Sequence, residues 1–89
     1  MTDTTRLQKA AGVMESRPEA GTVVLLNLNS NAYFSLEGAG AVAWDALDAT
    51  FGEVLGTVLD EFEVEPEVAR RDLSELLEEL VQNGLVRVD

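Results

Sequence analysis

Carboxylates are the most abundant chemically active side chains of this 89-residue chain, with 17 Asp and Glu against 6 Lys and Arg. Two groups could surround a cation: the pair Asp45 and Asp48, and the acidic stretch 60–65. Neither group has the alternating oxygen ligands and central glycine of a calcium loop. Because carboxylates also cover solvated helix faces, we predict no metal site and no bound cofactor.

The residues that usually perform acid–base and nucleophilic catalysis are missing. The chain has no His and no Cys, so Ser30, Ser35 and Ser74 have no imidazole to activate them. Gly38 and Gly40 lie between an expected strand and an expected helix, but no third glycine and no Lys-Ser or Lys-Thr pair follows, which argues against a phosphate-binding loop. We therefore predict that the protein is not an enzyme.

The net charge of −11 opposes binding to nucleic acids and to anionic membranes. Arg70 and Arg71 are the only basic residues of the last expected helix, whereas a DNA-reading helix is basic. No apolar run approaches the roughly 20 residues of a membrane helix, and residues 1–12 lack the apolar centre of a signal peptide. These features predict a cytoplasmic protein without nucleic-acid or membrane partners. The acidity serves either solubility or attraction to a basic segment of a partner.

The first half of the chain predicts three β-strands. Val23 to Leu28 is a nearly continuous run of β-branched and aliphatic residues. Residues 29–31, Asn-Ser-Asn, favour a turn, and residues 32–36 return as a strand with Tyr and Phe. A shorter strand is expected over residues 13–17, where the following proline ends it. Together these segments predict a three-stranded antiparallel sheet.

After residue 36 the apolar spacing changes from two residues to about 3.6, which predicts helices. Thr50 and Glu53 form a capping box at the start of the second helix, Pro66 opens the third, and Gly84 ends it. The expected apolar stripes are Gly40, Ala43, Trp44 and Leu47; Phe51, Val54, Leu55, Val58, Leu59 and Phe62; and Ala69, Leu73, Leu76 and Leu80, widened by Leu77 and Val81. The order predicts an α+β fold, an N-terminal sheet followed by three helices.

The strand over residues 32–36 has the strongest functional potential. At the edge of its sheet, its unpaired N–H and C=O groups would be a template for another chain. Beside it the last helix would supply an apolar wall of Leu73, Leu77 and Val81, with Arg70 at one end. This combination is typical of peptide binding by β-strand addition. Plain core packing is the alternative for these residues, and a structural module that dimerises through the same edge is the alternative function.

The spacing of several residues resembles that of PqqD-like proteins over residues 13–88. The matching residues are Leu26-Asn-Leu28, Tyr33-Phe-Ser-Leu36, Gly40, Trp44, Leu47, Pro66-Glu67 and Asn83-Gly84-Leu85. The resemblance implies a winged-helix-like domain that recognises the leader of a ribosomally made precursor peptide. Such domains bind the leader as an extra antiparallel strand beside the third strand, against the third helix. Residues 1–12 would then be a flexible lead-in, and residues 13–89 the recognition domain.

Transferred to this chain, the resemblance implies a binding site on one strand and one helix. The implied residues are Ala32, Tyr33, Phe34, Ser35, Leu36, Arg70, Leu73, Ser74, Leu77 and Val81. Glu37 departs from the family, in which many members have Asn. The implied partners are the precursor leader and a separate maturation enzyme, either a radical-SAM enzyme as in pyrroloquinoline quinone synthesis or a leader peptidase and cyclase as in lasso-peptide synthesis.

Overall fold

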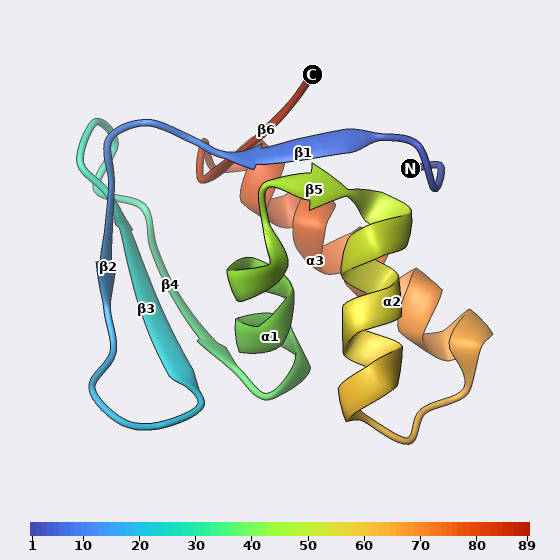
Figure 1. Ribbon diagram of the computed structural model, residues 1–89. Coiled ribbons are helices and arrows are strands. Elements are labelled where there is room, and N and C mark those ends of the chain that lie inside the picture. Colours follow the sequence, from blue (N-terminus) through green and yellow to red (C-terminus); the bar gives the residue numbers. More distant parts are fainter.

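The computed structural model describes residues 1–89 as two small antiparallel sheets and three helices (Figure 1). The strands are β1 (Arg6–Lys9), β2 (Val13–Ser16), β3 (Thr22–Asn27), β4 (Tyr33–Glu37), β5 (Ala49–Thr50) and β6 (Val86–Val88), and the helices are α1 (Ala39–Ala46), α2 (Phe51–Glu61) and α3 (Pro66–Gln82). The α+β class and the three helices predicted from the sequence are confirmed. No helix is long and apolar enough to cross a membrane.

The predicted N-terminal sheet is present, with the order β2-β3-β4. Val23 and Leu25 of β3 are buried, whereas the neighbouring Val24 and Leu26 are half-buried on the outer face. The β3–β4 turn closes through Asn31, whose φ of 63° lies in the left-handed region that Asn tolerates. One face of the sheet therefore joins the core and the other faces outward.

The second sheet, in the order β5-β1-β6, includes residues 6–9 of the segment 1–12 that was expected to be a flexible lead-in. Residues 6–9 form β1, which pairs with residues 49–50 on one side and 86–88 on the other. Leu7, the one apolar residue of this strand, is fully buried. A four-residue strand with a single apolar position has no detectable periodicity, and its partners lie far along the chain.

The helix boundaries follow the local signals in the sequence. Thr50 Oγ1 accepts a hydrogen bond from Glu53 N, and the Glu53 carboxylate accepts from Thr50 N, which completes the predicted capping box of α2. Pro66 is the first residue of α3. Gly84, with a φ of 71°, follows the end of α3 as the left-handed stop.

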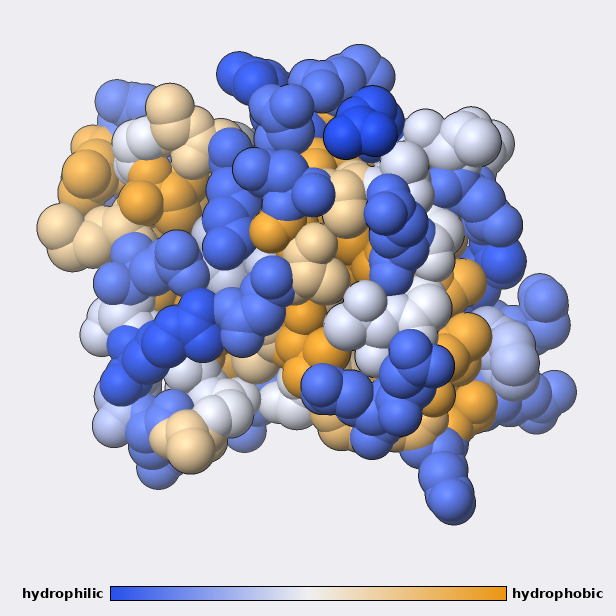
Figure 2. All heavy atoms as spheres, in the orientation of Figure 1, coloured by the Kyte–Doolittle hydropathy of each residue, from blue (hydrophilic) through white to orange (hydrophobic).

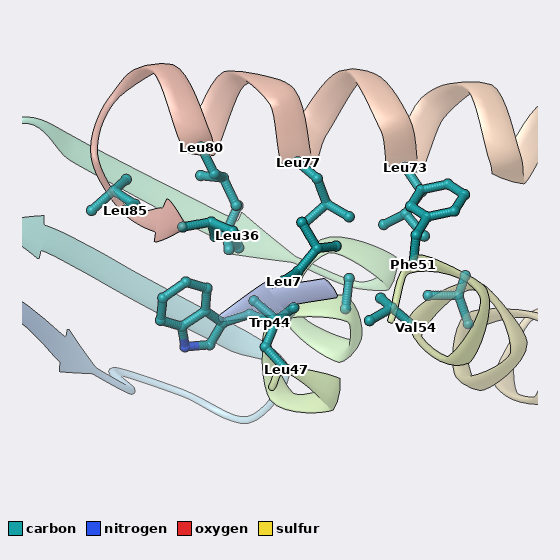
Figure 3. Close-up of a cluster of buried hydrophobic side chains, with 14 of the residues drawn as sticks. Leu7, Leu36, Trp44, Leu47, Phe51, Val54, Leu73, Leu77, Leu80 and Leu85 are labelled. Atoms are coloured by element: carbon teal, nitrogen blue, oxygen red, sulfur yellow. The ribbon is translucent and has the colours of Figure 1, made fainter. Parts of the chain in front are cut away.

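One hydrophobic core lies between the two sheets and the helices (Figure 3). Leu7, Trp44, Phe51, Leu77 and Leu85 are each at most 1% exposed. They come from β1, α1, α2, α3 and the link to β6, so the core joins both ends of the chain. Trp44, predicted as part of an apolar helix stripe, is thus confirmed as a core residue.

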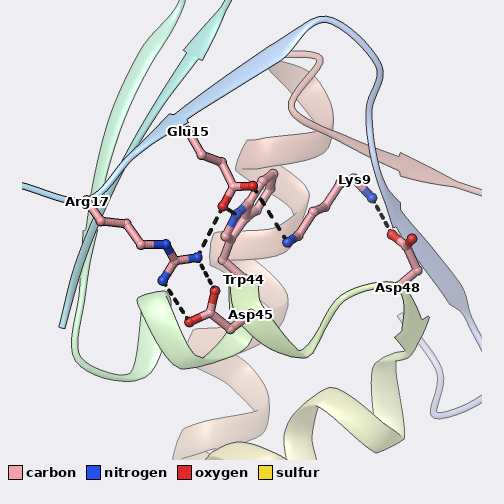
Figure 4. A network of polar contacts seen from close by, with 6 residues as sticks. All are labelled: Lys9, Glu15, Arg17, Trp44, Asp45 and Asp48. Atoms are coloured by element: carbon pink, nitrogen blue, oxygen red, sulfur yellow. Dashed lines mark hydrogen bonds and ion pairs between the residues drawn. The ribbon is translucent and has the colours of Figure 1, made fainter. Parts of the chain in front are cut away.

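A polar network attaches β2 to α1 beside this core (Figure 4). Glu15 Oε1 accepts hydrogen bonds from Trp44 Nε1 at 2.7 Å and from Arg17 Nη2 at 3.2 Å. Both terminal nitrogens of Arg17 also donate hydrogen bonds to the Asp45 carboxylate. This hydrogen bonding holds the pKa of Asp45 below its usual value. Lys9 Nζ lies 5.0 Å from the centre of the Trp44 ring. The network fixes the orientation of the β2-β3-β4 sheet relative to the helices.

Candidate peptide-binding edge

Strand β4 is an edge strand, and the hydrogen-bond pattern identifies which of its residues bond inward. Asn27 N donates to Ala32 O at 2.8 Å, so these two residues form a bonded pair. In an antiparallel ladder the bonded pairs recur at every second residue. The register pairs Phe34 with Leu25 and Leu36 with Val23. The main-chain groups of Phe34 and Leu36 are therefore directed toward β3.

The intervening residues Tyr33, Ser35 and Glu37 direct their N–H and C=O groups away from β3. No strand of the chain lies on that side, and no other main-chain or side-chain hydrogen bond reaches these groups. An edge of this kind is a template for a further strand. The structure thus leaves a free edge of three residues.

The side chains of β4 divide between two faces. Leu36 is buried and Phe34 is half-buried against the core. Tyr33, 65% exposed, lies on the outer face with Met14 and Leu28, which are also more than half exposed. Figure 2 shows apolar atoms gathered at the upper left, over the end of the sheet where the β3–β4 turn lies. A strand added at the edge would extend both faces.

Helix α3 runs beside the open side of the β2-β3-β4 sheet (Figure 3). Near the C-terminal end of β4, a Cβ placed on Gly40 would lie 3.4 Å from Leu76 Cδ2 and 3.7 Å from Leu36 Cβ. At the other end, the Asn27 side chain donates to Asn83 O at 3.0 Å and to Gly84 O at 3.3 Å. These two attachments hold α3 antiparallel to β4.

The attachments also identify the flank of α3 that faces β4. Asp72, Leu76, Glu79 and Asn83 are spaced by three or four residues and share this flank. Leu76 is half-buried and its two acidic neighbours are exposed. The helix wall beside the free edge therefore has one apolar residue between two carboxylates.

A pocket of about 370 Å³ lies where β4 leads into α1. Its walls come from the start of α1, the end of α2 with the turn after it, and α3. The lining residues are Ala39, Gly40, Val58, Phe62, Glu63, Val64, Ala69, Asp72, Leu73 and Leu76. The pocket is apolar apart from Glu63 and Asp72, and it is large enough for one or two peptide side chains.

Two of the expected helix residues belong to the core. Leu77 is fully buried, and Leu73 is 6% exposed where it reaches the pocket. Both side chains pack beneath the groove between β4 and α3, and neither is exposed along the β4 edge. Leu76, expected as part of the buried stripe, is the apolar residue beside that edge.

The other three expected helix residues lie on the flank of α3 that faces the N-terminal segment. Arg70 Nη1 lies 2.6 Å from Asp3 Oδ1, and this hydrogen bond raises the pKa of Arg70. Ser74 donates to Glu78 at 3.3 Å. Val81 lines a separate pocket together with Met1 and Thr5 of the N-terminal segment. The sequence did not indicate these positions, because residues 1–12 were expected to be a flexible lead-in rather than a segment that lies beside α3.

No group of three or more Asp or Glu residues is arranged to hold a metal ion. No buried side-chain polar atom lacks a hydrogen-bond partner. What the site offers is a strand edge, an apolar pocket and a helix wall, which together can bind an extended peptide.

The family model for coenzyme PQQ synthesis protein D (PqqD) matches residues 22–86, from β3 to the start of β6. The chain belongs to the PqqD family. The resemblance read from the sequence is thus confirmed. No curated protein sequence matches this PqqD-family chain.

Two solved structures share the fold of this PqqD-family chain. TbiB1, solved in complex with the TbiA(beta) leader peptide, is 26% identical, with a TM-score of 0.81 over 90% of this chain and 94% of that chain. Lasso peptide synthetase B1, complexed with the leader peptide, is 24% identical, with a TM-score of 0.77 over 92% of this chain and 98% of that chain. The winged-helix-like architecture predicted from the sequence is confirmed by these matches.

Proposed function

We propose that this PqqD-family chain is a binding module that captures the leader of a ribosomally made precursor peptide by strand addition to β4. The observation that carries the proposal is the free edge of Tyr33, Ser35 and Glu37 beside α3. The family membership and the likeness to two proteins solved with leader peptides support it.

In the proposed complex the leader runs antiparallel to β4. Tyr33, Ser35 and Glu37 each exchange two main-chain hydrogen bonds with a leader residue. Leader residues opposite Phe34 and Leu36 direct their side chains inward, toward Leu76 and the pocket. Backbone bonding thereby supplies affinity that does not depend on sequence, and the inward side chains supply selectivity.

The module acts without catalysis of its own in this proposal, and it presents the precursor to a separate maturation enzyme. The partner is a leader peptidase with a cyclase, or a radical-SAM enzyme. Binding takes place in the cytoplasm, where the precursor is synthesised. We further propose that the helix wall for the leader is Asp72, Leu76, Glu79 and Asn83, because Arg70, Ser74 and Val81 already contact the N-terminal segment or lie beside it.

Amide hydrogen exchange tests the proposal residue by residue. The probe is a synthetic peptide with the leader sequence of the precursor, whose short reading frame we expect beside the gene for this chain. Without peptide, the amides of Tyr33, Ser35 and Glu37 should exchange fast, and those of Phe34 and Leu36 slowly, because only the latter are paired. With peptide, the three fast amides should become protected.

Protection confined to other elements would contradict strand addition. The same experiment separates peptide binding from self-association through this edge. If the three amides are already protected without peptide, and sedimentation gives a dimer, the edge serves assembly and the recognition role is refuted.

A further inference from the structure

A long central part of the chain contains no positive charge. Between Arg17 and Arg70 there is no Lys or Arg, whereas Asp and Glu recur throughout this part. It includes β3, β4, α1 and α2. Apart from α3, the elements that form the β4 edge and line its pocket therefore contain no Lys or Arg.

Two carboxylates line the pocket. They belong to Glu63 and Asp72, which are both exposed. No Lys or Arg nitrogen lies within 4.0 Å of the Glu63 carboxylate. Asp72 has only its exposed neighbour Arg71, at 3.5 Å. We call Glu63 and Asp72 the acidic rim.

Most of the remaining cations are engaged elsewhere. Lys9 and Arg17 contact Glu15. Arg70 contacts Asp3 on the other flank of α3, and Arg87 lies near Asp89 in the second sheet. The acidic rim is thus a negative surface beside an apolar pocket, with Arg71 as its one neighbouring cation, and it would complement a positively charged ligand.

The direction of strand addition decides which part of the peptide meets the rim. All pairs in the β2-β3-β4 sheet are antiparallel, and an antiparallel peptide enters at the Glu37 end of β4 and leaves at the Tyr33 end. The N-terminal flank of the added strand therefore lies at the pocket. The C-terminal flank, which leads to the core peptide, lies at the β3–β4 turn.

Resting on the function proposed above, we propose that the acidic rim selects leaders with Lys or Arg immediately N-terminal to the strand-forming segment. The apolar stem of a basic side chain can lie on the pocket wall while its charged end reaches Glu63 or Asp72. Each exposed ion pair is weak, but the rim discriminates against acidic leaders as well as attracting basic ones.

A selection from random peptides tests this without knowledge of the natural leader. The probe is a displayed library of random 12-residue peptides between Gly-Ser linkers, selected on the full chain. Enriched peptides that protect the Ser35 amide from exchange should carry Lys or Arg on the N-terminal side of an alternating apolar segment. Edge-binding peptides without this bias, or with basic residues on the C-terminal side, would overturn the proposal.

Two double variants then assign the effect to the rim. Glu63→Gln/Asp72→Asn should weaken binding of a selected basic peptide about three- to tenfold, as expected for two exposed ion pairs, and should reduce its salt dependence. Glu75→Gln/Glu78→Gln removes the same charge from the opposite side of α3 and should leave the affinity unchanged. Equal affinities for the two variants would refute the assignment.

Failure of the inference and failure of the proposed function give different results. If no enriched peptide protects the amides of Tyr33 and Ser35, strand addition itself is refuted, and the charge preference with it. If peptides bind the edge but are insensitive to the rim variants, leader capture stands and only the selectivity is refuted.

Discussion

A proline at position 35 would separate the folding role of β4 from its binding role. Ser35 is exposed, and its N–H is directed away from β3 and has no partner in the chain. Proline is tolerated on the open side of an edge strand, and the preceding residue, Phe34, already has the extended conformation that proline requires. We expect Ser35→Pro to fold and to lose peptide binding.

The size of the loss follows from the missing hydrogen bond. In the complex the substitution leaves a leader carbonyl without a donor in a partly desolvated groove, which costs about 1–3 kcal/mol. This corresponds to a Kd raised roughly 5- to 150-fold. The free chain loses only a bond to water, so its free energy of unfolding should change by about 0.5 kcal/mol or less.

The measurement is fluorescence anisotropy with a labelled peptide that protects the β4 edge, combined with thermal unfolding followed by circular dichroism. Ser35→Ala, which keeps the N–H, is the matched control and should bind as the unaltered chain does. Phe34→Pro should instead destabilise the sheet, because the Phe34 N–H pairs with Leu25. A folded Ser35→Pro variant that binds with unchanged affinity would refute the assignment of the free edge.

Three further predictions concern stability. Leu7→Ala should lower the free energy of unfolding by about 2–5 kcal/mol, measured by urea denaturation; a change below about 1 kcal/mol would show that β1 is not part of the core. Asn27→Ala should cost about 2 kcal/mol, or roughly 8–16 °C in Tm by calorimetry, because its amide joins α3 to the β3–β4 turn; an unchanged Tm would contradict this. The Arg17–Asp45 pair should stabilise the fold above the pKa that Asp45 has in the unfolded chain, and this stabilisation should be lost as the pH falls through the lowered pKa of Asp45 in the folded chain. Arg17→Gln should therefore make the free energy of unfolding less dependent on pH in the acid range, and identical pH profiles for the variant and the unaltered chain would argue against the pair.

Local signals were sufficient to predict the elements that surround the site. The apolar run of β3, the Asn-rich turn and the alternation in β4 each occur within a few adjacent residues. The capping box at Thr50 and the stop at Gly84 act on their own helix ends. These features depend on near neighbours in the chain, so the sequence alone was enough to read them.

The helix wall of the site could not be predicted because it depends on contacts between distant segments. Leu76 and Leu77 are adjacent and equally apolar, and only the packing of α3 decides that the first lies beside Gly40 and the second in the core. Arg70 was expected to be free for a ligand, but Asp3 pairs with it. The first difference follows from the packing of α3 on α1, and the second from the N-terminal segment before β1, which lies beside α3.

The pairing of β1 with β6 also determines how the module can be attached to other proteins. Asp89 N donates to Arg6 O at 3.1 Å, so both termini are tied into the β5-β1-β6 sheet and neither crosses the β4 edge. A catalytic domain fused through a short tether at either terminus would leave the groove accessible. The tether would raise the local concentration of captured substrate around that catalyst. The module could therefore be fused to an unrelated modifying enzyme to direct it to leader-bearing substrates.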